Sequence, residues 1–109
     1  MAPSPREAFE AKRSGVWLRF RGEVVRILKD DLKGARHQRF IIRQLDGLTL
    51  LISHNIDLAA RVPVKKSGIV DGFGLYEWNP KGGLIHWTHH DPQNKIPGGW
   101  IRFKGSAYR

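Results

Sequence analysis

The sequence contains no cysteine, only one methionine, and no apolar run long enough to cross a bilayer. Without cysteine there is no disulfide framework and no thiolate metal site, so a metal ion would need histidine or carboxylate ligands. Acidic residues are also scarce. There are ten of them against nineteen lysines and arginines, which leaves a net charge of +9. Such a surface attracts polyanions, and nucleic acid is therefore the first candidate partner.

The length of 109 residues suits one domain, and eleven aromatic residues, four of them tryptophan, predict a folded core. We expect residues 1–15 to form a flexible or short helical lead-in and residues 16–109 to form a single domain. The N-terminus has no apolar signal core. As it stands, the sequence predicts a cytoplasmic protein, or an exported one if a leader has been removed. No protein partner is predicted.

Alternating apolar and polar residues predict a chain made mainly of β-strands. The first alternation begins at Val16 and is interrupted at Gly22, which is typical of a long strand bent by a bulge. Further strands are predicted over residues 37–43, 48–53, 69–78 and 84–87, with hairpin turns at 46–47 and 79–83. Residues 54–60 have too few β-branched residues for a strand and suit a short helix or a turn, which we take as a short helix between strands three and four. This order indicates an all-β fold, a five-stranded OB-like barrel.

That topology would gather the histidines, because the first loop and the ends of strands three and five lie at one end of the barrel. The residues expected there are His37, His54, His86, His89, His90, Asp57, Asp71 and Asp91. Glu77 and Asn79 are expected on the opposite hairpin. Single histidines are often only structural, but a group of them is typical of sites that bind metals or move protons.

Hydrolysis of a phosphodiester needs an activated nucleophile, neutralised phosphate charge and a stabilised leaving oxygen. The predicted catalytic residues are His54, Asp57, His86 and His90, with a histidine as general base and a carboxylate as the orienting group. A divalent metal ion is the expected cofactor, and its predicted ligands are His86, His89 and Asp91.

Basic and aromatic residues predict a path for a nucleic-acid strand. Arginine offers fork-shaped donors for phosphate, and aromatic rings stack on unpaired bases. The predicted binding residues are Arg36, His37, Arg39, Arg43, Lys65, Lys66 and Trp78. Trp87 and Trp100 are expected in the core.

Four segments of the sequence are distinctive: GARHQRF (34–40), HNIDLA (54–59), YEWNPKGG (76–83) and IHWTHHDP (85–92). In these segments the chain resembles an uncharacterised family of small bacterial proteins, over roughly residues 22–108. The resemblance implies no activity, although members of that family often look exported. It draws attention to Asn55, Glu77 and Asn79 in addition to the five histidines, Asp57 and Asp91.

Three functions fit these observations. The favoured hypothesis is a small nuclease that acts on single-stranded nucleic acid at the histidine end of the barrel. A second hypothesis is an OB-type module that binds single strands without cutting them. The third is a metal-binding or cell-surface module with no role in nucleic-acid binding, which would take up metal ions but have no affinity for a strand.

Overall fold

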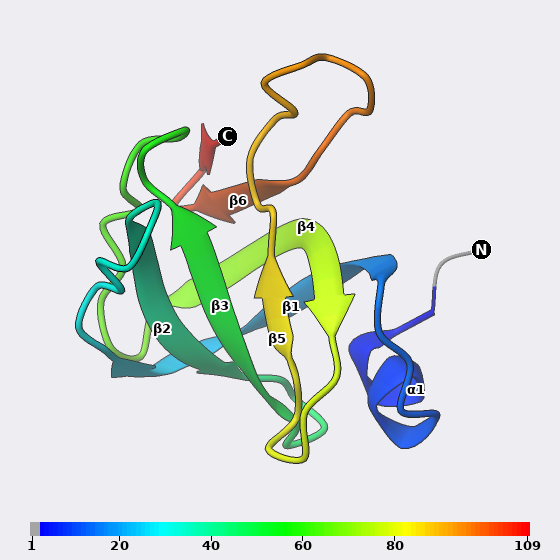
Figure 1. The fold of residues 1–109 in the computed structure, drawn as a ribbon. Helices are drawn as coiled ribbons and strands as arrows, with labels where there is room; N and C mark the ends of the chain where they lie inside the picture. The colour runs from blue at the N-terminus through cyan, green and yellow to red at the C-terminus, as the bar shows by residue number, and fades with distance from the viewer. Residues whose placement is uncertain (1–2) are drawn as a thin grey trace.

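The first five strands of the chain close into a barrel (Figure 1). The structure is a computed structural model that describes residues 3–109. Its elements are α1 (Pro5–Glu10), β1 (Val16–Ile27), β2 (His37–Arg43), β3 (Thr49–Asn55), β4 (Ile69–Glu77), β5 (Leu84–His86), β6 (Trp100–Phe103) and β7 (Ser106–Tyr108). The predicted all-β class is confirmed.

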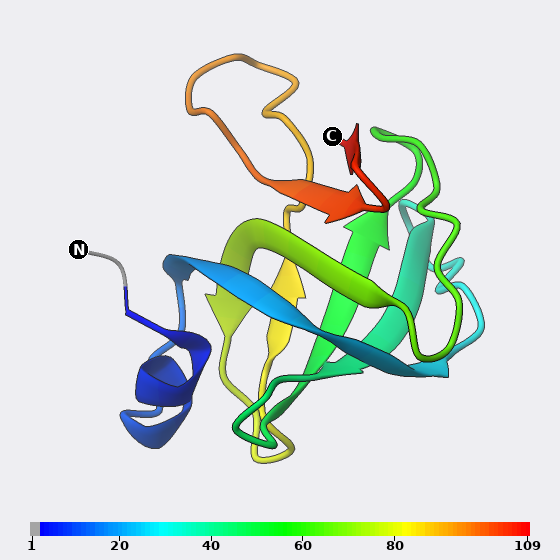
Figure 2. The same cartoon turned by 180° about the vertical axis from the view of Figure 1, so that it is seen from behind.

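Closure of the barrel depends on β1, which pairs antiparallel with both β2 and β4. The ring is completed by the antiparallel pairs β2–β3 and β4–β5 and by the parallel pair β3–β5. This is the strand order predicted for an OB-like barrel. Beyond the barrel, β6 pairs with β4 and β7 pairs with β6, which widens one sheet (Figure 2). The sequence pattern did not predict these last two strands.

The bend in β1 lies at a bulge between Val24 and Arg26, not at Gly22. Gly22 instead allows close approach of β1 to the end of β2, since a Cβ there would lie only 2.6 Å from the Arg43 carbonyl oxygen. The glycine is therefore required for strand contact, while the bulge next to it re-aims β1 from β4 towards β2.

Alternate residues of the strands fill the barrel interior, as the period of two requires. The fully buried side chains include Leu18, Phe40, Ile52, Tyr76 and Ile101, and Tyr76 donates its hydroxyl hydrogen to the Gly82 carbonyl at 2.8 Å. The residues between these positions lie on the outer surface of the barrel, so the strand register determines which side chains share an outer face.

The lead-in before the barrel is an ordered helix. Ser4 and Glu7 form a capping box at the start of α1, and Ala8 is fully buried in the core. Trp78 stacks on Phe9 with ring centroids 6.3 Å apart, and its indole N–H donates to the Phe9 carbonyl at 3.0 Å. Within residues 3–109 no helix is long and apolar enough to cross a membrane.

The short helix predicted over residues 54–60 is not present. His54 and Asn55 continue β3, and the chain then makes a single turn in which the Ala59 N–H donates to the Asn55 carbonyl at 3.1 Å. The Asp57 carboxylate in this turn accepts two hydrogen bonds from Arg36, which joins the turn to the loop before β2. Low β-propensity here reflected a turn.

Candidate functional site

His54 is fully buried, and both of its ring nitrogens are engaged. Nε2 lies 2.9 Å from the Ala60 carbonyl oxygen, and Nδ1 lies 2.7 Å from the Thr88 hydroxyl. Because a carbonyl can only accept, Nε2 carries the hydrogen and Nδ1 accepts from Thr88. Burial lowers the pKa of His54 and keeps the ring neutral. In this state His54 joins β3 to two loops and has no free nitrogen for a substrate.

The other rings at the histidine end also bind backbone carbonyls. His89 Nδ1 lies 2.7 Å from the His90 carbonyl, and His37 Nδ1 lies 2.9 Å from the Ala35 carbonyl. Burial lowers the pKa of His89, and proximity to the rings of His89 and His37 adds to the effect of burial in lowering the pKa of His54. The predicted gathering is thus present for these three residues, while His90 is exposed.

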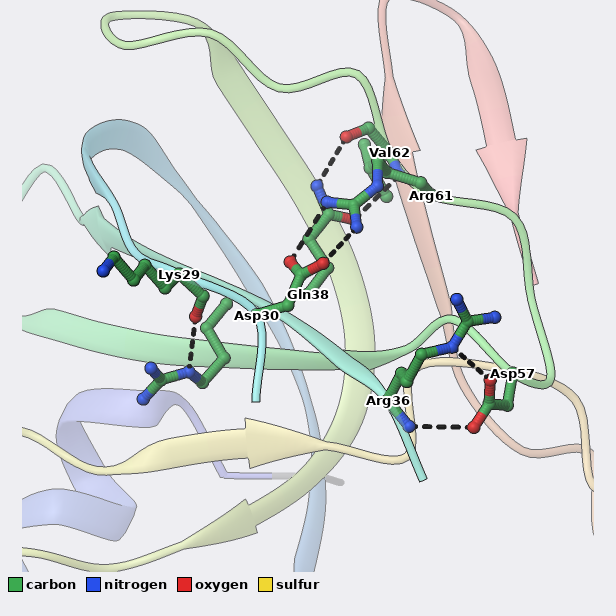
Figure 3. A network of polar contacts seen from close by, with 8 residues as sticks. Lys29, Asp30, Arg36, Gln38, Asp57, Arg61 and Val62 are labelled. Atoms are coloured by element: carbon green, nitrogen blue, oxygen red, sulfur yellow. Dashed lines mark hydrogen bonds and ion pairs between the residues drawn. The ribbon is translucent and has the colours of Figure 1, made fainter. Parts of the chain in front are cut away.

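The two carboxylates predicted to act with these histidines organise loops. Asp57 accepts from the Arg36 backbone N–H and from Arg36 Nε, each at 2.8 Å, and the Arg36 bonds lower the pKa of Asp57 (Figure 3). Asp91 accepts three backbone N–H groups from residues 93, 95 and 96 at 2.9 to 3.2 Å, which lower its pKa. Both side chains remain anionic and hold the chain at the barrel end.

His86 lies apart from this group, beside Glu77. The distance from His86 Nε2 to Glu77 Oε1 is 3.6 Å, although Glu77 was expected on the opposite hairpin. Strand β5 has only three residues, so its two ends are close together and His86 reaches the end of β4. Among the described residues, no group of three or more histidine, aspartate or glutamate side chains is placed to hold a metal ion. The catalytic and metal-ligand roles of the predicted residues stay predictions.

The predicted strand-binding residues fall in separate places. Arg36 pairs with Asp57, and Arg39 Nε donates to the Lys29 carbonyl at 3.0 Å (Figure 3). Trp78 is packed on α1, as described above. Lys65 and Lys66 are exposed in the segment before β4, and Arg43 is exposed at the end of β2. Arg43 alone among these residues lines the groove described next.

A set of aromatic and arginine side chains occupies the outer surface of β1, β4 and β6, which lie side by side in Figure 2. The register places Arg19, Phe73 and Trp100 in one row across the three strands. The next row is Arg21, Asp71 and Arg102. We call this surface the tryptophan–arginine face, consisting of Trp17, Arg19, Arg21, Phe73, Trp100 and Arg102.

Contacts within the tryptophan–arginine face hold it in one arrangement. Trp17 stacks on Phe73 with centroids 5.6 Å apart, and the guanidinium groups of Arg19 and Arg102 each lie 5.4 Å from the Trp100 ring. The buried carboxylate of Asp71 accepts from Arg102 at 2.8 Å and lies 3.7 Å from Arg19. One carboxylate therefore orients two arginines against one indole ring.

A groove of about 860 Å³ lies beside the arginine row of this face and away from its three aromatic rings. The charged residues that line it are Arg19, Arg21, Arg43, Arg102, Glu23, Asp46 and Asp71. A hollow of about 540 Å³ lies on the other side of Arg19, between Phe73, Trp100 and Arg109. Sequence reasoning missed the face because Trp100 belongs to a strand that was not predicted. The alternation in the segment WIRF, with Trp100 and Arg102 on one side, was the signal that could have found it.

The fold and this surface define a class of protein, a small basic OB-like barrel with arginine and aromatic side chains across an outer sheet. The chain belongs to the family described as Protein of unknown function (DUF3465), which residues 4–109 match. The predicted membership of a family without an assigned activity is thereby confirmed. No curated protein matches the sequence.

Proposed function

We propose that this protein binds single-stranded nucleic acid on the tryptophan–arginine face. The observation that carries the proposal is the side-by-side placement of Arg19, Arg21 and Arg102 with Trp17, Phe73 and Trp100 on three adjacent strands. Proteins that bind single strands combine a positive groove, which follows the phosphates, with aromatic rings on which bases stack. The face supplies both, on a rigid sheet, in a chain of net charge +9.

A single strand fits this surface better than a duplex. The rings of Trp17, Phe73 and Trp100 are partly exposed, and the ring surface that their mutual contacts leave open can pack on unpaired bases, whose faces are covered in a duplex. Arginines already held against an indole lose little side-chain freedom when they bind phosphate. The interaction depends on ring stacking and charge, so we expect little preference for base sequence.

The outer surface of β2 and β3 is the usual binding surface of OB folds. In this chain that surface is less suited to a strand, because Arg36 is paired with Asp57 and Arg39 is bonded to a carbonyl. Arg43 lies at the edge of the groove on the other sheet. On the side of β1, β4 and β6, the three arginines Arg19, Arg21 and Arg102 share one carboxylate, that of Asp71, so this side keeps an excess of positive charge for phosphate.

The proposal is tested by fluorescence anisotropy with a labelled single-stranded oligonucleotide of mixed sequence and with the matching duplex. We expect the single strand to bind more tightly. Trp100→Ala should weaken it by about fivefold to a hundredfold, since base stacking on an aromatic ring is worth about 1–3 kcal/mol. Arg39→Gln tests the β2–β3 surface and should change the affinity little.

The matched control is Lys33→Gln, which removes one positive charge from the exposed loop before β2. If Lys33→Gln and Arg21→Gln weaken binding of the oligonucleotide equally, the affinity depends on net charge alone and not on the tryptophan–arginine face. No affinity for either form of nucleic acid would remove the proposal, and uptake of metal ions in the same sample would favour a metal-binding module instead.

Hydrolysis of the bound strand is a second candidate, favoured by the pair His86 and Glu77. His86 Nε2 is buried without a hydrogen-bond partner among the described residues, and the Glu77 carboxylate lies 3.6 Å from it. An imidazole next to a carboxylate is a pairing that moves protons in many hydrolases. His86 follows Leu75 in the row that begins with Trp17, so a strand on the tryptophan–arginine face passes near it.

Gel analysis of the oligonucleotide over time tests hydrolysis, with and without added divalent ions and chelator. Product that disappears in His86→Ala and in Glu77→Gln, while binding is kept, would establish this second function. Intact substrate under all conditions would leave binding alone. His90→Ala is the matched control, because that ring is exposed and lies in the following loop.

A further inference from the structure

The segment between β5 and β6, residues 87–99, projects from the barrel as a long loop (Figure 1). A hollow of about 530 Å³ lies between this loop and the turn after β3. Its apolar walls come from Leu58, Trp87, Pro92 and Ile96, and Lys95 is a positive residue that lines it. We call it the loop hollow.

One wall of the loop hollow is a pair of stacked rings. Trp87 and His89 have centroids 6.1 Å apart and planes inclined by 21°. Hydrogen bonding to the His90 carbonyl places the His89 hydrogen on Nδ1, which leaves Nε2 as an acceptor in the neutral ring. The wall is thus flat and aromatic, and it includes a hydrogen-bond acceptor.

Trp87 combines two unfavourable features. Its φ of +52° is the left-handed conformation that bulky residues rarely adopt, and its buried indole Nε1 has no hydrogen-bond partner within residues 3–109. Each feature is unfavourable by itself, and residues of this kind concentrate where a ligand is bound. The strained backbone turns the chain out of β5 at the point where the loop hollow begins.

The opposite wall is apolar and open. Leu58 and Ile96 remain 41% and 42% exposed, although each lines the hollow. The Asp91 carboxylate in the same lining is occupied by three backbone N–H groups, which partly offset its repulsion of an anion. A flat, mostly apolar ring that carries polar edge groups and a nearby phosphate matches this lining.

The loop hollow is continuous with the tryptophan–arginine face. The edge of Trp17 packs against Trp87 with centroids 5.7 Å apart, and the same Trp17 stacks on Phe73. Aromatic contacts therefore run from Phe73 through Trp17 to the ring pair at the hollow, and Trp100 is the neighbour of Phe73 in the strand register. A strand that follows the face reaches the hollow at its end.

We propose that the loop hollow receives one unstacked nucleobase of the bound strand, held between the Trp87–His89 ring pair and the side chains of Leu58 and Ile96. The inference rests on the proposed function and adds a specific base site to it. Lys95 is placed to contact the phosphate of the same nucleotide.

The test uses the full chain with two probes, deoxyadenosine monophosphate and a labelled single-stranded oligonucleotide. In ¹H–¹⁵N and methyl NMR spectra, the mononucleotide should shift the Trp87 indole and the methyl resonances of Leu58 and Ile96. Ile96→Ala should weaken oligonucleotide binding by about fivefold, the low end of the loss for one base contact. Leu32→Ala is the matched control, because Leu32 is an exposed apolar residue that does not line the hollow.

Trp87→Phe keeps an aromatic ring and removes the indole N–H, so it should reduce the mononucleotide shifts at Leu58 and Ile96 without unfolding the chain. Oligonucleotide binding that is sensitive to Trp100→Ala, but unchanged in Ile96→Ala and without mononucleotide shifts at the hollow, would overturn the base site and leave the proposed function. Absence of oligonucleotide binding would overturn both.

Discussion

At the scale of single residues, the buried histidines act as neutral hydrogen-bonding groups. His54 donates to one carbonyl and accepts from one hydroxyl, and it has no solvent exposure. Protonation would add a buried charge, and the Thr88 hydroxyl would have to turn from donor to acceptor to keep its bond with Nδ1. These rings are therefore linked to the stability of the fold.

Stability should decrease as the pH falls through the range in which histidine titrates. The pKa of His54 and that of His89 are lowered from 6.5 in the folded state, so the unfolded chain binds protons first. The contribution of these two rings to the free energy of unfolding is thus fully present above about pH 6.5. Below that pH the contribution decreases, by up to about 1.4 kcal/mol per pH unit for each ring.

Urea denaturation between pH 7.5 and 4.5 measures this dependence. His54→Gln should be less stable than the parent at pH 7.5 and should show a flatter dependence on pH. His90→Gln changes an exposed ring in the loop between β5 and β6, and this variant should keep the full dependence of stability on pH. A parent protein whose stability does not change above pH 4.5 would contradict the prediction, because lowered aspartate pKa values act only below about pH 4.

Substitution of Asp71 can distinguish the effect of arginine orientation from the effect of net charge on binding at the tryptophan–arginine face. Asp71→Asn raises the net charge by one, which by itself favours a polyanion, but it removes the carboxylate that orients Arg19 and Arg102. We expect affinity for the single strand to fall. Glu10→Gln adds the same charge at an exposed site on α1 and should slightly raise the affinity. A gain in Asp71→Asn equal to that of Glu10→Gln would show that the orientation of the arginines is unimportant.

At the scale of elements, α1 is part of the barrel's packing. Ala8 enters the core, and Phe9 stacks on Trp78 at the end of β4. A helix of six residues is not stable alone, so its order comes from the capping box and from this tertiary contact. The sequence predicted that Trp78 binds a nucleic-acid strand, whereas in the structure its ring packs against α1.

Phe9→Ala should lower the free energy of unfolding by about 1–3 kcal/mol, below the range for a fully buried phenylalanine because Phe9 is only half-buried. Chemical denaturation followed by tryptophan fluorescence measures the loss. Leu32→Ala, at a residue that is 69% exposed, should stay within about 0.5 kcal/mol of the parent. Equal stability of Phe9→Ala and the parent would show that the contact between α1 and Trp78 contributes nothing to the stability of the fold.

At the scale of the whole molecule, the excess of positive charge predicts binding that weakens with salt. If Arg19, Arg21 and Arg102 each contact one phosphate, the logarithm of the affinity should fall with the logarithm of salt concentration with a slope of about −2, at about 0.7 per contact. Arg21→Gln should reduce the slope by about 0.7, whereas Lys33→Gln should leave it unchanged. A slope near zero would contradict phosphate contact on this face.

The barrel itself was largely predictable. Alternation in β1 through β4 and the turn residues at 46–47 and 79–83 identify the strands, because one buried face requires a period of two. The prediction was wrong over residues 54–60, where a side-chain bond from Arg36 to Asp57 stabilises a turn. The last two strands, β6 and β7, were missed because both are short, and β6 contacts only the first half of β4.

The sequence by itself determined the class of the fold, the positive charge and the polar or apolar side of each strand, because these depend on local alternation and composition. Only the tertiary structure decided which outer residues become neighbours. Pairing of β4 with both β1 and β6 brings Arg19, Phe73 and Trp100 into one row from three distant segments. The loops after β3 and β5 meet His54 with the Ala60 carbonyl and the Thr88 hydroxyl. The register between strands is a long-range property, so the sequence alone could not show that Arg19, Phe73 and Trp100 are neighbours. For the same reason it could not show that the ring nitrogens of His54 are engaged by loops of the fold.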